Sequence, residues 1–112
     1  MIEQPQKEEN LLLLKELEAK PNITQRELSV RLNISLGKTN YLLRELIFKG
    51  FIKAKNFTNN SGKLMKIHYL LTEKGLEEKF RLLKHFLQIK EEEYNKLKQE
   101  WKYSLNEKAG RL

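Results

Sequence analysis

The apolar positions near the start of the chain predict a helix from about Glu8 to Lys20. Leucine stands at positions 11, 12, 13, 14 and 17, and Pro21 disfavours helical backbone in the residue before it. We expect the residues from Gln4 to Lys7 to form a tail. Because four consecutive leucines wrap most of the way round a helix, we expect another element to cover part of them, either the C-terminal helix or a partner chain.

A second helix is predicted from its start signals. Thr24 suits the N-cap, Glu27 is its capping-box partner three residues later, and Ile23 with Leu28 forms a hydrophobic staple. We therefore expect the helix to begin at Gln25.

A third helix follows after a very short turn. The second helix is expected to end near Leu32, where Asn33 can adopt the left-handed conformation, and Ser35 can cap a helix that ends at Gly50. At helical spacing, one side of this third helix carries Leu36, Thr39, Leu43, Leu46 and Ile47. With the small Ser29 where the two helices approach, the pair forms a helix-turn-helix.

Beyond Gly50 the spacing of the apolar residues shortens to about two, which predicts strands. Ile52 and Ala54 fall on one face, and Phe51, Lys53 and Lys55 fall on the other. After turn residues 58–62, the pattern predicts a return strand. In it, one set of positions alternates with the other: Met65, Ile67, Tyr69 and Leu71 with Lys66, His68 and Leu70. The segment is therefore a basic hairpin, or wing.

The last segment predicts one long helix. Thr72 can cap it, and a helix from Glu73 to about Tyr103 would be roughly 46 Å long. Its apolar stripe, interrupted only by Lys90, consists of Leu76, Phe80, Leu83, Leu87, Tyr94, Leu97 and Trp101. So long a stripe predicts a homodimer interface. The alternative is a helix that folds back on its own domain after a break near Lys90 to Glu93.

These elements define the expected fold class, which is mainly α with a two-stranded β-wing. We expect a winged helix-turn-helix DNA-binding domain over residues 1–75 and a long C-terminal helix for dimerisation over residues 76–112. A chain of 112 residues with 39% hydrophobic content has material for one compact domain plus one long element.

The charge is concentrated in the predicted DNA-binding domain. The net charge is +7 for the whole chain, and also +7 for residues 21–75, where ten Lys or Arg face three Glu. Residues 1–20 contribute −2 and residues 76–112 contribute +2. A basic surface concentrated in this way favours a nucleic-acid partner, whereas the alternative, a solvated lysine-rich surface, would spread the charge more evenly.

The third helix is expected to enter the major groove of double-stranded DNA, with its N-terminal half facing the bases. Asparagine suits adenine, lysine or arginine suits guanine, and tyrosine can contact thymine methyls or phosphate. The start of the second helix suits a phosphate, and the wing can reach the flanking backbone or minor groove. The candidate DNA-binding residues are Gln25, Arg26, Ser35, Gly37, Lys38, Asn40, Tyr41, Arg44, Lys55, Asn60, Lys63 and Lys66. The alternative is that these residues only solvate the surface.

Enzyme chemistry finds little support in the sequence. There is no cysteine and no glycine-rich phosphate loop, and His68 and His85 are isolated, so we expect no catalytic residues, no cofactor and no metal. The longest apolar run, from Leu11 to Leu14, is too short for a bilayer span, and the first residues lack a signal-peptide pattern. We therefore expect a cytoplasmic protein without a membrane partner.

Three segments resemble the MarR-type winged-helix regulators, most closely the short members associated with exopolysaccharide gene clusters. The resemblance lies in residues 25–29 (QRELS), 43–52 (LRELIFKGFI) and 71–75 (LTEKG). It implies a dimer that binds a pseudo-palindromic operator, with the Leu36 to Lys49 helix in the major groove and the Phe57 to Lys63 region as the wing.

The chain departs from this family in two places. Family wings commonly carry an Asp and Arg pair near the tip, where this chain has Asn59, Asn60 and Lys63. We also expect no extra N-terminal dimerisation helix before Glu8. Because family ligand pockets lie between the dimer helices and the DNA-binding lobe, we do not expect a small-molecule effector.

The sequence therefore predicts a transcriptional regulator that binds a specific operator as a homodimer. The alternative is a winged-helix module that docks on another protein without specific DNA binding, since a fold alone does not establish function.

Overall fold

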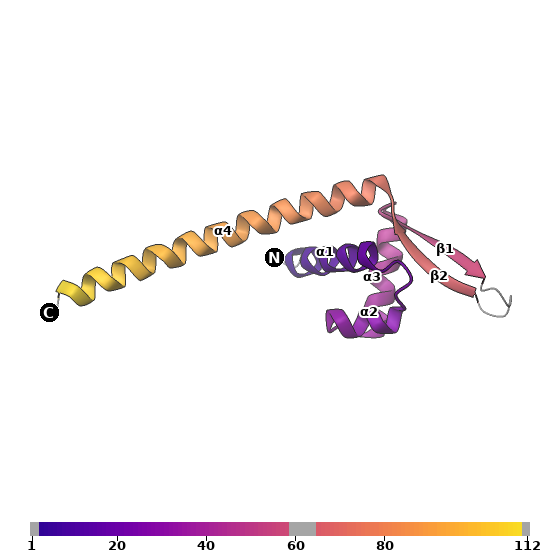
Figure 1. The fold of residues 1–112 in the computed structure, drawn as a ribbon, viewed down its shortest axis with the longest axis horizontal. Helices are drawn as coiled ribbons and strands as arrows, with labels where there is room; N and C mark the ends of the chain where they lie inside the picture. Colours follow the sequence, from indigo (N-terminus) through magenta and orange to yellow (C-terminus); the bar gives the residue numbers. More distant parts are fainter. Residues whose placement is uncertain (1–2, 59–64, 111–112) are drawn as a thin grey trace. The chain divides into compact units, whose positions relative to one another are not determined.

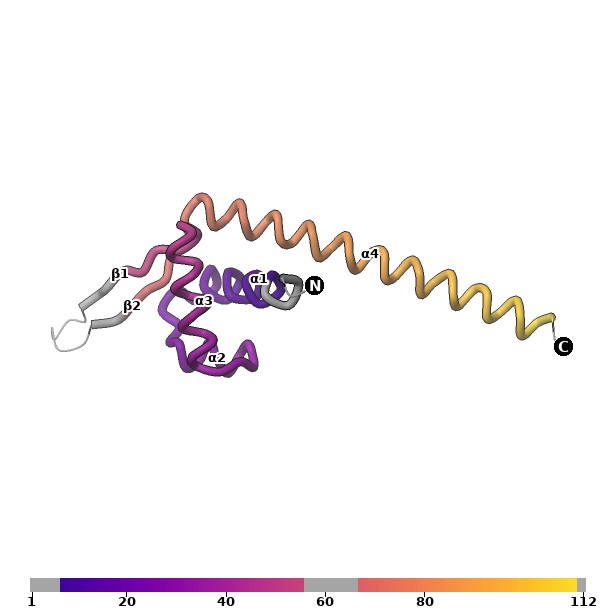
Figure 2. The backbone as a smooth tube through the Cα atoms, turned by 180° about the vertical axis from the view of Figure 1, so that it is seen from behind, coloured from indigo at the N-terminus to yellow at the C-terminus, as the bar shows by residue number. Residues whose placement is uncertain are grey.

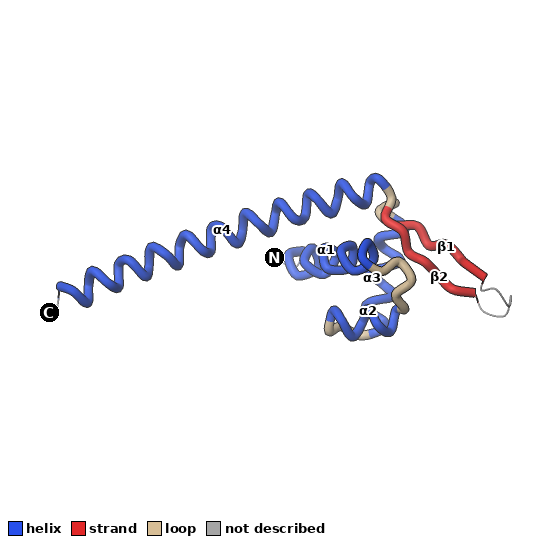
Figure 3. The backbone as a smooth tube through the Cα atoms, in the orientation of Figure 1, coloured by secondary structure: helices blue, strands red, loops and turns tan. Residues whose placement is uncertain are grey.

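The computed structural model describes the backbone of residues 3–58 and 65–110 and the side chains of residues 7–55 and 67–110. Along the chain the elements are α1 (Glu3–Ala19), α2 (Gln25–Leu32), α3 (Leu36–Phe48), β1 (Ile52–Thr58), β2 (Met65–Leu71) and α4 (Glu73–Gly110) (Figure 1). The predicted class is confirmed: the chain is mainly α, with a two-stranded wing and a long C-terminal helix (Figure 3).

The contacts divide the chain into two units, Met1–Leu82 and Leu83–Leu112. In the first unit, α1 packs against α2 and β2, while α3 packs against α2 and β1 (Figure 2). The division falls inside α4, between Leu82 and Leu83, and not after Gly75 where the sequence placed the boundary. The side chain of Leu82 is only 1% exposed, so the first turns of α4 are part of the compact unit.

Helix α1 begins earlier than expected. It starts at Glu3, so the tail proposed for Gln4 to Lys7 is wrong and those residues are helical. Pro5 does not prevent this, because a proline in the first turn lacks only an N–H that has no partner inside the helix. Four of the five leucines are buried (Leu11, Leu13, Leu14 and Leu17), and Leu12 remains exposed.

The predicted caps of α2 and α3 are confirmed. The hydroxyl of Thr24 accepts a hydrogen bond from the Glu27 N–H at 3.0 Å, and Ser35 accepts one from the Lys38 N–H at 3.0 Å. Asn33 closes α2 in the left-handed conformation, with φ 56° and ψ 47°. Satisfied ends make both helices locally stable, so the short turn between them is fixed by its own residues.

The wing is an antiparallel hairpin in which Ile52 pairs with Leu71 and Ala54 pairs with Tyr69. Ile52 and Ala54 lie on one face of β1 as predicted, since side chains alternate along a regular strand. Ile52 and Tyr69 are buried, whereas Ala54 is exposed. Among the hairpin side chains that the structure describes, the buried ones are Ile52 and Tyr69, which lie toward the end nearest α3 and α4. The backbone N–H of Tyr69 donates to the carbonyl of Pro21 at 2.9 Å and ties β2 to the turn before α2.

The apolar side of α3 is narrower than predicted. Thr39, Leu43 and Leu46 are buried as expected, and Leu42 joins them. The sequence placed Leu36 and Ile47 on the same side, but both are exposed. They lie at the edges of the apolar side of α3, near the two ends of the helix.

Helix α4 begins at a crowded junction with the loop that follows α3. Thr72 caps α4 by accepting from the Gly75 N–H at 3.0 Å, and its own N–H donates to the Phe51 carbonyl at 3.0 Å. A Cβ atom on Gly75 would overlap the carbonyl oxygen of Phe51. Glycine therefore allows the first turn of α4 to approach the backbone at Phe51 closely.

Helix α4 is also longer than expected, since it ends at Gly110 and not near Tyr103. No glycine or proline interrupts the sequence between Leu76 and Ala109. The helix continues through Lys90 to Glu93, so the break required by the fold-back alternative is not observed.

Candidate nucleic-acid interface

The burial of one side of α3 leaves a polar side that faces solvent. Lys38, Tyr41 and Arg44 are exposed, and Asn40 is half-buried at the edge of the same surface. These four residues are among the twelve that the sequence predicted to reach DNA. Ser35 and Gly37 are exposed at the start of the helix, and no described atom lies within 4 Å of the position that a Gly37 Cβ would occupy.

Lys38 forms an ion pair that the sequence did not predict. Its Nζ lies 2.8 Å from Oε2 of Glu9 on α1. The lysine is about half exposed while the glutamate is mostly covered, so the cation can still turn toward another anion. Because the pair joins residues 29 positions apart in the chain, no local pattern indicated it.

Asn40 is linked through Gln25 to the wing. Its Nδ2 donates to Oε1 of Gln25 at 3.3 Å, and Nε2 of Gln25 donates to the hydroxyl of Tyr69 at 3.1 Å. The hydrogen bonds of Asn40 with Gln25 and of Gln25 with Tyr69 thus connect three elements. Asn40 belongs to α3, Gln25 is the first residue of α2, and Tyr69 belongs to β2. Both ends of the Gln25 amide are therefore engaged within the protein, although the sequence placed Gln25 among the DNA contacts.

Tyr41 and Glu45 are neighbours one turn apart on α3. A hydrogen bond to the Glu45 carboxylate raises the pKa of Tyr41 above its usual value. Glu45 also lies 3.0 Å from Nζ of Lys49. The hydroxyl of Tyr41 is therefore a hydrogen-bond donor whose proton is directed at Glu45.

Arg44 and Arg26 are exposed cations without an ion pair to any residue that the structure describes. Both hold planar guanidinium groups, which can bind phosphate or a guanine edge through two hydrogen bonds. Arg26 lies in the first turn of α2, beside the N-terminal amides. The negative charge of the neighbouring Glu27 is offset by an ion pair with Lys20. A hydrogen bond from the Lys20 ammonium holds the pKa of the Glu27 carboxyl below its usual value.

The candidate residues on the wing are described only in part. Lys55 is exposed on β1. Asn60 and Lys63 lie outside the described residues, and of Lys66 only the backbone, in β2, is described. The contribution of the wing tip to DNA binding therefore remains a prediction from the sequence.

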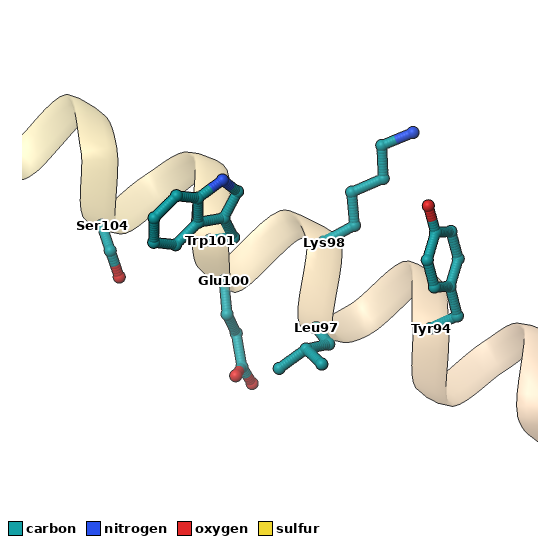
Figure 4. Close-up of a pocket in the computed structure, with 6 residues that line it drawn as sticks. All are labelled: Tyr94, Leu97, Lys98, Glu100, Trp101 and Ser104. Carbon is teal, nitrogen blue, oxygen red and sulfur yellow. The ribbon is translucent and has the colours of Figure 1, made fainter.

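The stripe predicted for dimerisation is exposed along α4. Its seven residues are all exposed, and Tyr94, Leu97 and Trp101 expose 63%, 66% and 63% of their surface. A shallow depression on this helix is lined by Tyr94, Leu97, Lys98, Glu100, Trp101 and Ser104 (Figure 4). All six side chains come from α4 alone.

The described residues offer neither a metal site nor a membrane-spanning helix. They include no group of three His, Cys, Asp or Glu side chains placed to hold a metal ion. Among the helices in the same ranges, none is long and apolar enough to cross a membrane.

Residues 10–53 match the family model described as winged helix-turn-helix DNA-binding. This segment contains the end of α1, all of α2 and α3, and the start of β1. No curated protein matches the sequence of this chain with significance. The sequence match therefore covers the helix-turn-helix, the second half of α1 before it and the first residues of β1 after it.

The fold is similar to solved structures of bacterial and archaeal regulators. Staphylococcus aureus MarR in complex with salicylate and kanamycin has a TM-score of 0.59 and 22% identity, over 78% of this chain and 56% of that chain. An S. aureus MepR mutant bound to an oligodeoxyribonucleotide has a TM-score of 0.56 and 19% identity, over 88% of this chain and 76% of that chain. A Pyrococcus horikoshii transcriptional regulator homologue has a TM-score of 0.58 and 17% identity, over 73% of this chain and 79% of that chain.

These likenesses define the class of fold: the chain is a winged helix-turn-helix protein with the MarR-type arrangement of elements. The chain spans a little over half the length of S. aureus MarR, 56%, and a similar share, 55%, of another solved regulator, PcaV from Streptomyces coelicolor. At these levels of identity the likeness concerns the fold.

Proposed function

We propose that this protein is a transcriptional regulator that binds double-stranded DNA through the exposed side of α3. The observation that carries the proposal is the placement of Asn40, Tyr41 and Arg44 on the solvent side of the second helix of a helix-turn-helix. In this motif the second helix lies in the major groove, where amide and guanidinium groups distinguish base edges. The family model, which matches residues 10–53, describes this segment as DNA-binding.

Electrostatics supports the same surface. Arg26, Arg44 and Lys55 are exposed cations on α2, α3 and β1, and the ion pair of Lys38 with Glu9 is partly open to solvent. A duplex attracts such cations along its phosphates and releases bound counterions when they bind. Among the relatives, the MepR mutant was solved with an oligodeoxyribonucleotide on the same kind of fold.

The protein is expected to bind duplex DNA with a steep dependence on salt. In a mobility-shift or anisotropy titration, the logarithm of the association constant should fall linearly with the logarithm of salt concentration, by about 0.9 for each phosphate neutralised. Selection from randomised duplexes should enrich a pseudo-palindrome with half-sites about 10 base pairs apart, centre to centre. Affinity that does not change with salt, or no affinity for DNA, would contradict this function and favour a protein-docking module.

We further propose that the active form is a homodimer held mainly by α4. Every residue from Lys90 to Gly110 is exposed in the single chain, although helices in proteins owe most of their stability to packing of an apolar face. The aromatic and leucine side chains of the stripe recur at three- and four-residue spacing, which places them on one side. A second copy offers the same stripe, so a two-fold axis can bury both together.

Light scattering at tens of micromolar is expected to give twice the chain mass of 13.4 kDa. Leu97→Gln should weaken the dimer, because about 1.5–3 kcal/mol of burial is lost from each of the two copies. Lys96→Gln places the same side chain at the adjacent position, outside the stripe, and should leave the dimer intact. A wild-type monomer, or equal effects of the two substitutions, would be evidence against this interface.

The remaining parts of the proposal come from the sequence resemblance. An operator with two-fold symmetry follows from the dimer, since two copies of α3 related by a two-fold axis read two equivalent half-sites. The particular likeness to the short exopolysaccharide-associated regulators stays a prediction from residues 25–29, 43–52 and 71–75.

A further inference from the structure

The charged residues beside the apolar stripe of α4 alternate in sign. Glu77, Lys84, Glu91 and Lys98 recur every seven residues, and each directly follows a position of the stripe. Residues seven apart in a helix point in nearly the same direction, so these four lie along one edge of the stripe. All four are exposed, and none forms an ion pair with any residue that the structure describes. We call this row of four residues the alternating edge.

The alternating edge is complementary to the same edge of a second copy. In an antiparallel pair of helices the same edges meet, whereas in a parallel pair opposite edges of the stripe meet. With a two-fold axis between positions 88 and 89, Glu77 lies beside Lys98 of the second copy. Lys84 then lies beside Glu91 of the second copy. Because the axis repeats both contacts, four pairs of opposite charge are formed.

The alternation of signs also specifies the register of the two helices. If one helix slides by seven residues in one direction, Lys84 lies beside Lys98 of the second copy. If it slides by seven residues in the other direction, Glu77 lies beside Glu91. Like charges at such flanking positions repel, so both neighbouring registers are disfavoured.

A parallel pair in register is less favourable than the antiparallel pair. It would place Lys90, the one charged residue of the stripe, against Lys90 of the second copy. It would also place Lys79 beside Lys84, and its favourable charge contact would be that of Glu93 with Lys98. In the antiparallel pair Lys90 instead lies opposite a leucine of the second copy, so the two lysines do not face each other.

The same antiparallel register brings large apolar side chains together. It places Trp101 of the second copy opposite Leu76, at the start of α4. Leu76 borders a hollow of about 230 Å³ on the compact unit, whose lining includes Leu17, Pro21 and Leu71. The indole of Trp101 is 63% exposed in the single chain and faces this hollow of the other copy when the helices pair. Burial of both apolar surfaces stabilises the pair.

We infer that two copies of α4 pair antiparallel, with Lys84 of each beside Glu91 of the other and Trp101 of each over the hollow beside Leu76 of the other. This inference rests on the homodimer proposed above and specifies its geometry. In this arrangement the second half of α4 from one copy covers the first half of α4 from the other. Both halves of the helix are therefore needed in each chain.

Exchange of charges on the alternating edge tests the pairing. Lys84→Glu should raise the dissociation constant of the dimer about tenfold, because it turns two attractions into two repulsions. The double variant Lys84→Glu/Glu91→Lys restores opposite charges and should return the constant to within about twofold of the wild type. The matched control is Lys96→Glu, which makes the same change of charge away from both edges of the stripe and should have little effect. Sedimentation measurements at low salt and at about 1 M salt should show these differences shrinking as salt rises.

A distance between two labels tests the direction of the helices. Because the chain contains no cysteine, Asn106→Cys carries a single nitroxide label at an exposed position outside the stripe. In the antiparallel register the two labels should be roughly 52 Å apart, since α4 rises by about 1.5 Å per residue. A slide by seven residues would change this distance by about 10 Å, and a parallel pair would bring the labels within about 25 Å of each other.

The outcomes separate this geometry from the proposed function. A wild-type monomer would overturn the homodimer together with this arrangement, while DNA binding by α3 is decided separately in the salt titration. A dimer with a short distance between labels, or one that Lys84→Glu strengthens, would be parallel and would overturn the antiparallel pairing alone. A distance about 10 Å longer or shorter than expected, or a double variant as weak as Lys84→Glu, would overturn the register.

Discussion

Replacing Gly75 with alanine is expected to lower the free energy of unfolding by about 1–3 kcal/mol. The added Cβ would overlap the carbonyl oxygen of Phe51. That oxygen cannot simply move away, because it also accepts hydrogen bonds from the Thr72 N–H at 3.0 Å and from the Thr72 hydroxyl at 3.1 Å. Relief of the overlap would therefore displace the first turn of α4 and weaken these bonds.

The sign of the effect makes this prediction specific. Within a helix, alanine normally exceeds glycine in stability by about 0.5–1 kcal/mol, so an ordinary position would show the opposite change. Gly37→Ala is the matched control in the same compact unit, since a Cβ there meets nothing within 4 Å. Urea and thermal unfolding followed by circular dichroism should show Gly37→Ala as neutral or stabilised. A Gly75→Ala variant that melts at or above the wild-type temperature would contradict the close approach.

The features that the sequence predicted correctly are local ones. Thr24, Ser35 and Asn33 cap their helices as expected because a cap depends on the few residues around it. The hairpin and the long C-terminal helix followed from the period of the apolar pattern in the same way. The predicted ends of helices were less accurate where no capping residue or helix breaker marks them, as at the start of α1 and at the end of α4.

The features that the sequence did not predict depend on which elements become neighbours. Lys38 was expected to face DNA, and it is exposed on α3, but its pairing with Glu9 requires α1 to pass beside α3. Gln25 and Tyr69 are separated by 44 positions, so their hydrogen bond has no local signal. Gly75 offered one signal that was not used: a poor helix former in the first turn of a helix indicates close packing.

The second large effect concerns Arg44, whose substitution by alanine should cost about 1–3 kcal/mol on the preferred operator. Arg44 is exposed on α3 without an ion pair to any described residue, so its guanidinium is available for two hydrogen bonds to a guanine edge. The loss should relax discrimination at one or two base pairs in each half-site. Scrambled duplexes should respond much less, because they provide no such base contact.

Lys55→Ala is the matched control, since it removes one positive charge from an exposed position on β1. A lysine near phosphates acts as a flexible point charge, so this variant should weaken binding to operator and scrambled duplexes alike and reduce the salt slope by about one per protomer. The same result is expected for Lys63→Ala, from the sequence. The measurement is a salt titration of each variant on both duplexes. If Arg44→Ala weakens both duplexes equally, α3 does not read bases through this residue, and Arg44 contacts only the phosphate backbone.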